Sequence, residues 1–105
     1  MITPEQIQSV VEVLVDHFEP DKIVLFGSYA DGTATEQSDI DLLVIKDTDL
    51  PKSRRLMGLG RKLTEVLVHP MDILVYTPAE VKEQSDFDLA FVTRILREGK
   101  VLYEH

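Results

Sequence analysis

The chain has 105 residues, of which 44% are hydrophobic and 29% are charged, and it contains no cysteine. A chain of this size and composition can bury a core as one domain, and the lack of cysteine excludes disulfides and thiolate metal sites. The formal net charge of −8 argues against a general nucleic-acid-binding protein, because such proteins need a basic surface.

The first predicted element is an amphipathic helix near the N-terminus. Thr3 is a typical N-cap, Pro4 suits the first helical position, and Gln6 can complete a capping box. The residues 19–21 (Glu-Pro-Asp) end this helix. Between these limits the apolar residues follow helical spacing, at Ile7, Val10, Val11, Leu14, Val15 and Phe18.

Two predicted strands follow, with a polar loop between them. Residues 22–26 (KIVLF) are apolar and β-branched and stop at Gly27. Residues 28–38 are small and polar, which predicts a loop with one helical turn at its start. Residues 39–46 (DIDLLVIK) predict the second strand, whose far end is apolar on both faces and therefore central in a sheet.

The second half of the chain continues the alternation of helices and strands. A helix is predicted over residues 53–68, weakened by Gly58 and Gly60. The remaining predicted elements are a third strand over 71–77, a short helix opening at Pro78, a helix from about Phe87 to Arg97 and a last short strand over 101–103. This order predicts an α/β or α+β fold with a mixed sheet.

Basic residues are concentrated in and beside the predicted helix 53–68. Five of the eleven fall within eleven positions, namely Lys52, Arg54, Arg55, Arg61 and Lys62. A solvated helix face is the simpler interpretation, and contact with a triphosphate or an acidic partner is the alternative.

Three aspartates carry the strongest chemical signal. Asp39 and Asp41 stand at the head of the second strand, where residues two apart point to the same face. Two like charges held this close repel each other, and a divalent cation resolves the conflict. Asp72 stands near the start of the third strand, so neighbouring strands would bring it beside the pair. Three such carboxylates could hold two Mg²⁺ ions about 4 Å apart for in-line phosphoryl displacement.

The turn at Gly27 and Ser28 supplies a place for phosphate. Glycine lets backbone approach a phosphate closely. Ser28 offers a hydroxyl and amide groups at the start of a helical turn, where the helix dipole favours anions.

These motifs together resemble a known family. The Gly27-Ser28 pair, ten further residues and then Asp39-x-Asp41 resemble the signature of the polymerase-beta nucleotidyltransferase superfamily. Three sequence motifs resemble the minimal nucleotidyltransferase (MNT) family, and the resemblance covers nearly the whole chain. They are the motif G-S-Y-A-x-G, the strand S-D-I-D-L-L-V and the C-terminal motif I-L-R-E-G-K-V-L-Y. The resemblance implies the nucleotidyltransferase core, a short mixed sheet flanked by helices, as a single domain over residues 1–105.

The same resemblance implies a function and a partner. Family members pair with a HEPN-domain ribonuclease toxin, and the MNT antitoxin transfers AMP from ATP to a tyrosine of that toxin. Carried over by position, Gly27 and Ser28 would hold the ATP phosphates, Asp39 and Asp41 would bind Mg²⁺, and Asp72 would complete the site as metal ligand and base. One departure is Asp31, where many relatives carry Arg, which removes a possible phosphate or structural contact.

Two alternatives stay open at this stage. The chain could neutralise its partner by binding alone, or it could transfer a nucleotide to a small molecule; transfer to RNA is disfavoured by the charge. The N-terminus has no apolar signal core, and no apolar run approaches the roughly 20 residues of a membrane helix. We therefore expect a cytoplasmic protein.

Overall fold

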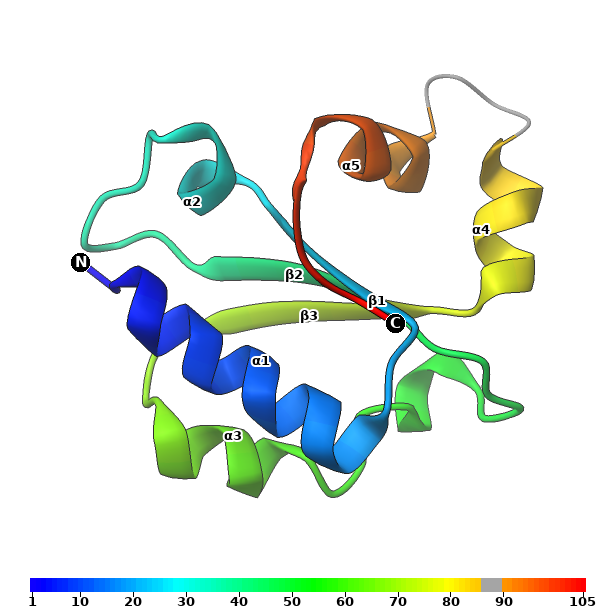
Figure 1. Cartoon of the computed structure of the whole chain (residues 1–105), viewed down its shortest axis with the longest axis horizontal. Coiled ribbons are helices and arrows are strands. Elements are labelled where there is room, and N and C mark those ends of the chain that lie inside the picture. The colour runs from blue at the N-terminus through cyan, green and yellow to red at the C-terminus, as the bar shows by residue number, and fades with distance from the viewer. Residues whose placement is uncertain (86–89) are drawn as a thin grey trace.

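A four-stranded mixed sheet organises the chain, and the computed structural model describes residues 1–85 and 90–105 (Figure 1). The sheet order is β3-β2-β1-β4, in which β1 runs antiparallel to both β2 and β4, while β2 and β3 are parallel. The predicted mixed sheet is thus confirmed. The strands are β1 (Lys22–Phe26), β2 (Ile40–Ile45), β3 (Met71–Tyr76) and β4 (Lys100–Glu104).

Helices cover both faces of this sheet. Figure 1 shows α1 and α3 on one face, and α2 and α5 on the other. None of the helices in the described ranges is long and apolar enough to span a membrane. The helices are α1 (Pro4–Phe18), α2 (Ser28–Asp31), α3 (Gly60–Val66), α4 (Pro78–Ser85) and α5 (Phe91–Glu98), with a single 3-10 turn, η1 (Lys52–Arg54).

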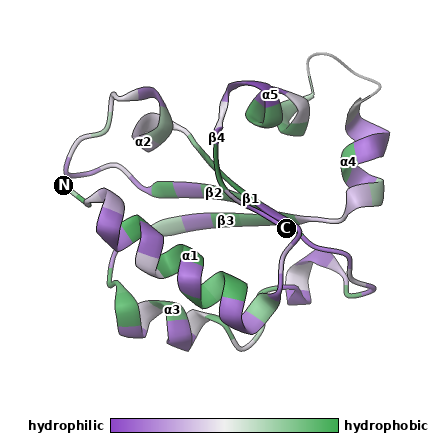
Figure 2. Ribbon diagram, viewed as in Figure 1, coloured by the Kyte–Doolittle hydropathy of each residue, from purple (hydrophilic) through white to green (hydrophobic). Residues whose placement is uncertain are grey.

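The N-terminal helix has the predicted capping box. The amide of Gln6 donates to the Thr3 hydroxyl at 3.2 Å, and the amide of Thr3 donates to the Gln6 side chain at 2.8 Å. Hydrophobic and hydrophilic residues alternate along α1 with helical spacing (Figure 2). Its apolar side therefore packs on the sheet.

Alternation along the strands divides the core into two layers. The layer under α1 and α3 contains Ile23, Leu25, Ile40, Leu42 and Val44. The layer under α5 contains Val24, Leu43, Val92 and Ile95. Asp41 lies two residues before Leu43 on β2, so its side chain points to the α5 face.

The predicted helix over residues 53–68 is wrong in its first half. Gly58 has φ 87°, a left-handed conformation that interrupts a right-handed helix, and α3 begins only at Gly60. The helix predicted from Phe87 is seen as α5 from Phe91 to Glu98, and Phe87 itself lies outside the described residues.

Strand boundaries differ from the prediction by one or two residues. β2 begins at Ile40, so Asp39 precedes the strand, and β4 extends over Lys100–Glu104. β3 ends at Tyr76, because Thr77 begins the cap of α4. The position of each strand along the chain agrees with the prediction, whereas the sheet order β3-β2-β1-β4 comes from the structure.

Arg55 belongs to a buried network, so neither interpretation of the basic cluster applies to it. Its guanidinium donates to the carbonyls of Leu50 at 2.9 Å and Val75 at 3.0 Å. It also forms an ion pair with Glu80 at 2.7 Å. Glu80 in turn caps α4, because its carboxylate accepts the amide of Thr77 at 2.9 Å. Arg55 thus fastens the segment between β2 and α3 to β3 and α4.

This network predicts a pH-dependent stability. The hydrogen bond from Arg55 holds the pKa of Glu80 at about 2, below its ordinary value of 4.5. A lowered pKa in the folded state stabilises the fold above pH 4.5, and this contribution is lost as pH falls toward 2. We expect Glu80→Gln to cost about 2 kcal/mol at pH 7, measured by urea unfolding, with a smaller difference at pH 3.

Glu104→Gln provides the matched control for that experiment. Glu104 pairs with Lys22 at 3.0 Å, but its side chain is 63% exposed. Exposed ion pairs contribute little, about 0–1 kcal/mol. A Glu80→Gln effect as small as that of Glu104→Gln, or one that stays constant with pH, would contradict the role assigned to the network.

Candidate active site

Asp41 and Asp72 are direct neighbours across two parallel strands. They are paired in the register of β2 and β3, and adjacent strands lie roughly 4.8 Å apart. Asp72 lies two residues before Leu74, which packs in the layer under α5, so both carboxylates project on the α5 face. The structure therefore brings these two predicted residues together.

Asp39 is held in the same neighbourhood by the residues on either side of it. The carbonyl of Ser38 bonds to the Nε2 atom of His69 at 2.8 Å, which places the proton on that nitrogen. The amide of Ile40 donates to the carbonyl of Pro70 at 3.1 Å. Both contacts fasten the start of β2 to the segment just before Asp72, which keeps the backbone at Asp39 near the other two aspartates.

The electrostatics agree with this proximity. The pKa of Asp41 is raised above its ordinary value of 3.8, first by burial and then by the charges of Asp72 and Asp39. The ionised form of Asp41 is therefore destabilised in the protein alone. A cation at this position would relieve that repulsion.

Gly27 lets the turn after β1 press against Asp41. Phe26 pairs with Asp41 in the register of β1 and β2, and Gly27 follows it with φ 75°. A Cβ atom on Gly27 would collide with the carboxylate of Asp41, whose Cγ would lie 3.2 Å away. Ser28 then begins α2, as predicted. The turn and the carboxylates therefore form one continuous site.

The three carboxylates suit Mg²⁺ without forming a closed cage. Among residues 1–85 and 90–105, no three acidic or histidine side chains converge closely enough to hold a metal by themselves. Mg²⁺ is typically bound by one or two carboxylates and completes its shell with water and substrate phosphate. The raised pKa of Asp41 and its pairing with Asp72 fit such an open arrangement.

Asp31 has a local structural role that the sequence alone does not show. Its carboxylate accepts the amide of Thr33 at 3.0 Å and the hydroxyl of Thr33 at 2.5 Å. These bonds fix the loop that leaves α2 at Gly32. The acid at this position therefore braces the loop that follows the phosphate turn.

Tyr29 packs between the turn and the first helix. Its hydroxyl accepts the amide of Ile2 at 3.2 Å, and its ring packs on the core layer under α1. Packing is therefore its role in this structure.

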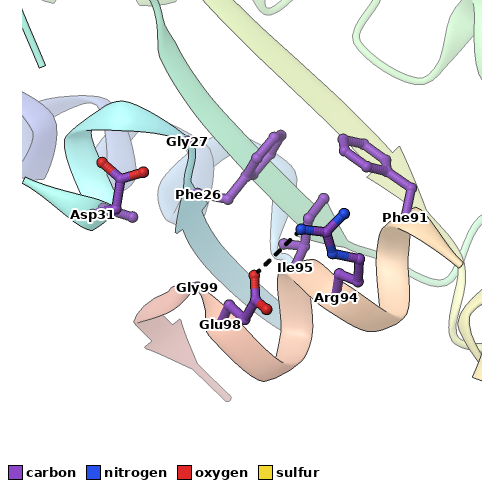
Figure 3. A pocket seen from close by; sticks show the side chains of 9 residues that line it. Phe26, Gly27, Asp31, Phe91, Arg94, Ile95, Glu98 and Gly99 are labelled. Carbon is purple, nitrogen blue, oxygen red and sulfur yellow. Dashed lines mark ion pairs between the residues drawn. The ribbon is translucent and has the colours of Figure 1, made fainter. Parts of the chain in front are cut away.

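A cavity of about 290 Å³ lies between the turn and α5, and the sequence did not predict it (Figure 3). Phe91, Arg94 and Glu98 contribute to it from α5. In sequence, Arg94 and Glu98 are an ordinary i, i+4 pair of an exposed helix. Only the packing of α5 over β1 shows that this side of the helix faces the site.

Comparison with known proteins places the chain among nucleotidyltransferases. The family model described as "Nucleotidyltransferase domain" matches residues 7–103. A relative in Methanocaldococcus jannaschii, "Putative protein adenylyltransferase MJ0604", is 38% identical over 82 residues, which cover 78% of this chain and 77% of the relative. A second from the same organism, "Putative protein adenylyltransferase MJ1379", is 33% identical over 86 residues, covering 77% of this chain and 85% of the relative.

Solved structures show the same fold. A toxin–antitoxin complex with AMP-PNP superposes with a TM-score of 0.65 at 24% identity, covering 93% of this chain and 73% of that chain. A mutant of the toxin–antitoxin pair MntA–HpeT also gives 0.65, at 23% identity and with the same coverage. At this identity the likeness concerns the fold, and it confirms the predicted nucleotidyltransferase core.

Proposed function

This chain belongs to the nucleotidyltransferase domain family, and we propose that it is a Mg²⁺-dependent protein adenylyltransferase that transfers AMP from ATP to a tyrosine of a HEPN ribonuclease toxin. The observation that carries the proposal is the in-register pair of Asp41 and Asp72 beside the Gly27 turn. The relatives named as protein adenylyltransferases support a protein acceptor. The MNT resemblance, on which the HEPN partner and the tyrosine rest, agrees with the family match.

Each predicted site residue has a role in this reaction. The backbone at Gly27 and Ser28 would hold the triphosphate, and Asp39, Asp41 and Asp72 would hold Mg²⁺, as one or two ions. When bound, Mg²⁺ would supply positive charge against the phosphates and the pyrophosphate leaving group. The tyrosine oxygen attacks the α-phosphorus of ATP, the bond to pyrophosphate breaks, and the carboxylate of Asp72 accepts the hydroxyl proton.

The partner and the nucleotide have a further line of support. A protein of the same fold forms a toxin–antitoxin complex and was crystallised with AMP-PNP, an ATP analogue. In this chain Asp31 braces its own loop, so the acid at this position does not argue for an inactive site. We therefore prefer catalysis to neutralisation by binding alone.

The test is transfer of label from ATP to the purified HEPN partner in the presence of Mg²⁺. ATP labelled at the α-phosphate should label the partner, and ATP labelled at the γ-phosphate should not, because pyrophosphate leaves. Replacing the acceptor tyrosine with Phe, or adding EDTA, should abolish the label. Neutralisation of the toxin without any label would assign the chain to binding alone and would overturn the proposal.

A further inference from the structure

The cavity beside the phosphate turn adjoins the catalytic carboxylates. It is lined from β1 and α2 by Phe26, Gly27, Ala30 and Asp31. Phe26 pairs with Asp41 in the sheet, and Gly27 presses against that carboxylate. A molecule whose phosphates lie at Gly27 therefore has this cavity within reach of its other end. Figure 3 shows Asp31 on one side and the α5 side chains on the other.

Its walls offer aromatic and aliphatic surface to a flat ring. The rings of Phe26 and Phe91 meet edge to face, with centroids 5.7 Å apart. Phe91 is 56% exposed, although large aromatic side chains are usually mostly buried. Ile95 and Ala30 add apolar surface between them. The volume of about 290 Å³ is near the lower end for small-molecule sites and suits one ring system.

The charged residues of the cavity favour a group that donates hydrogen bonds. Asp31 and Glu98 contribute two carboxylates, and Arg94 contributes one guanidinium, 3.9 Å from Glu98. Carboxylates therefore outnumber cations in the lining. An ionised carboxylate only accepts hydrogen bonds. An uncharged ring that carries an amino group matches these walls.

We infer that this cavity is the base subsite of the nucleotide donor, in which Phe91 stacks on the adenine ring and a carboxylate of the lining accepts the adenine amino group. The inference rests on the proposed function, because it assumes that the triphosphate lies at Gly27. It adds Phe91 and Glu98 to the residues that contact the substrate.

Binding calorimetry on the purified chain tests the inference without the partner. Phe91→Ala should weaken binding of ATP with Mg²⁺ about tenfold, the scale of one base–aromatic stacking contact. The same variant should bind tripolyphosphate with Mg²⁺ as tightly as wild type, because tripolyphosphate has no base. Val101→Ala is the matched control, since Val101 is a 48% exposed hydrophobic residue outside the cavity.

A second probe addresses the amino group and does not depend on Phe91. Purine riboside triphosphate differs from ATP only by the missing amino group, so it should bind wild type more weakly than ATP. Glu98→Ala should reduce this preference. The Glu98 side chain is 64% exposed, so the substitution leaves the core intact.

The outcomes separate this inference from the proposed function. If wild type binds neither ATP nor tripolyphosphate with Mg²⁺, the proposed function fails. If ATP binds and Phe91→Ala leaves its affinity unchanged, the base subsite is overturned and the proposed function stands. If Phe91→Ala leaves the affinity for ATP unchanged but slows transfer to the partner, the cavity binds the acceptor protein instead of the base, and the inference is also overturned.

Discussion

Replacing Asp41 with Asn is expected to reduce nucleotidyl transfer by roughly 10³-fold and to raise the melting temperature of the protein. The activity falls because the amide cannot neutralise a cation or support the developing charge. The stability rises because the burial and the neighbouring charges that raise the pKa of Asp41 also destabilise its ionised form. A residue kept for chemistry at a cost in stability is common in active sites.

The stability difference between Asp41→Asn and wild type should depend on pH in a defined direction. A carboxyl whose folded pKa is raised destabilises the fold at neutral pH, and this penalty disappears as pH falls below the ordinary value of 3.8. The advantage of Asp41→Asn over wild type should therefore be present at pH 7 and absent near pH 3. Thermal melts at the two pH values measure it.

Asp49→Asn serves as the control, because it removes the same charge from an exposed loop. It should leave nucleotidyl transfer unchanged. Added Mg²⁺ should raise the melting temperature of wild type more than that of Asp41→Asn, since only wild type has all three carboxylates. If Asp41→Asn melts below wild type at pH 7, the electrostatic account of the site is wrong.

The sequence predicted those features of the fold that depend on local patterns. The cap at Thr3, the apolar spacing of α1 and the three strands around the aspartates follow from rules that act over a few residues. The sequence predicted that Asp72 lies beside Asp41 if β2 and β3 are neighbours, and the structure adds the parallel direction and the register that pair the two residues. The predicted site residues were therefore available before any tertiary information.

Features that depend on contacts between distant segments could not be predicted in this way. Arg55 belongs to a basic cluster in sequence, and only its distance of 2.7 Å to Glu80, 25 residues away, shows that it is buried and paired. The left-handed backbone at Gly58 shortens α3, although the apolar spacing around it is helical. Likewise, the cavity depends on how α5 packs over β1, and the local sequence pattern does not predict this packing.

Gly27→Ala is expected to destabilise the fold and to weaken nucleotide binding more than any other glycine substitution in the site. Two costs add at this position. With φ 75° and ψ −157°, Gly27 lies in a backbone region that is essentially restricted to glycine, where a side chain costs about 1–3 kcal/mol. The new Cβ would also displace the carboxylate of Asp41 or the turn itself. Either displacement separates the turn at Gly27 from the carboxylates that we propose as metal ligands.

Gly32→Ala is a control that places a side chain at another positive-φ position, in the left-handed region, without a collision. Gly32 has φ 84°, and nothing lies within 4 Å of a Cβ placed there. It should show the backbone cost alone, with ATP affinity close to wild type. Urea unfolding and calorimetry with ATP and Mg²⁺ measure the two effects separately.

A double-mutant cycle with Asp41→Ala identifies the collision directly. With the carboxylate removed, the collision is gone, and a Cβ on Gly27 would lie at an ordinary 3.4 Å from the Cβ of residue 41. Gly27→Ala should therefore cost less in the Asp41→Ala background, where only the backbone cost at ψ −157° remains, than in wild type. The excess cost in wild type is the coupling energy between turn and carboxylate. Equal costs of Gly27→Ala in both backgrounds would show that the turn and Asp41 act independently, and the single continuous site would have to be abandoned.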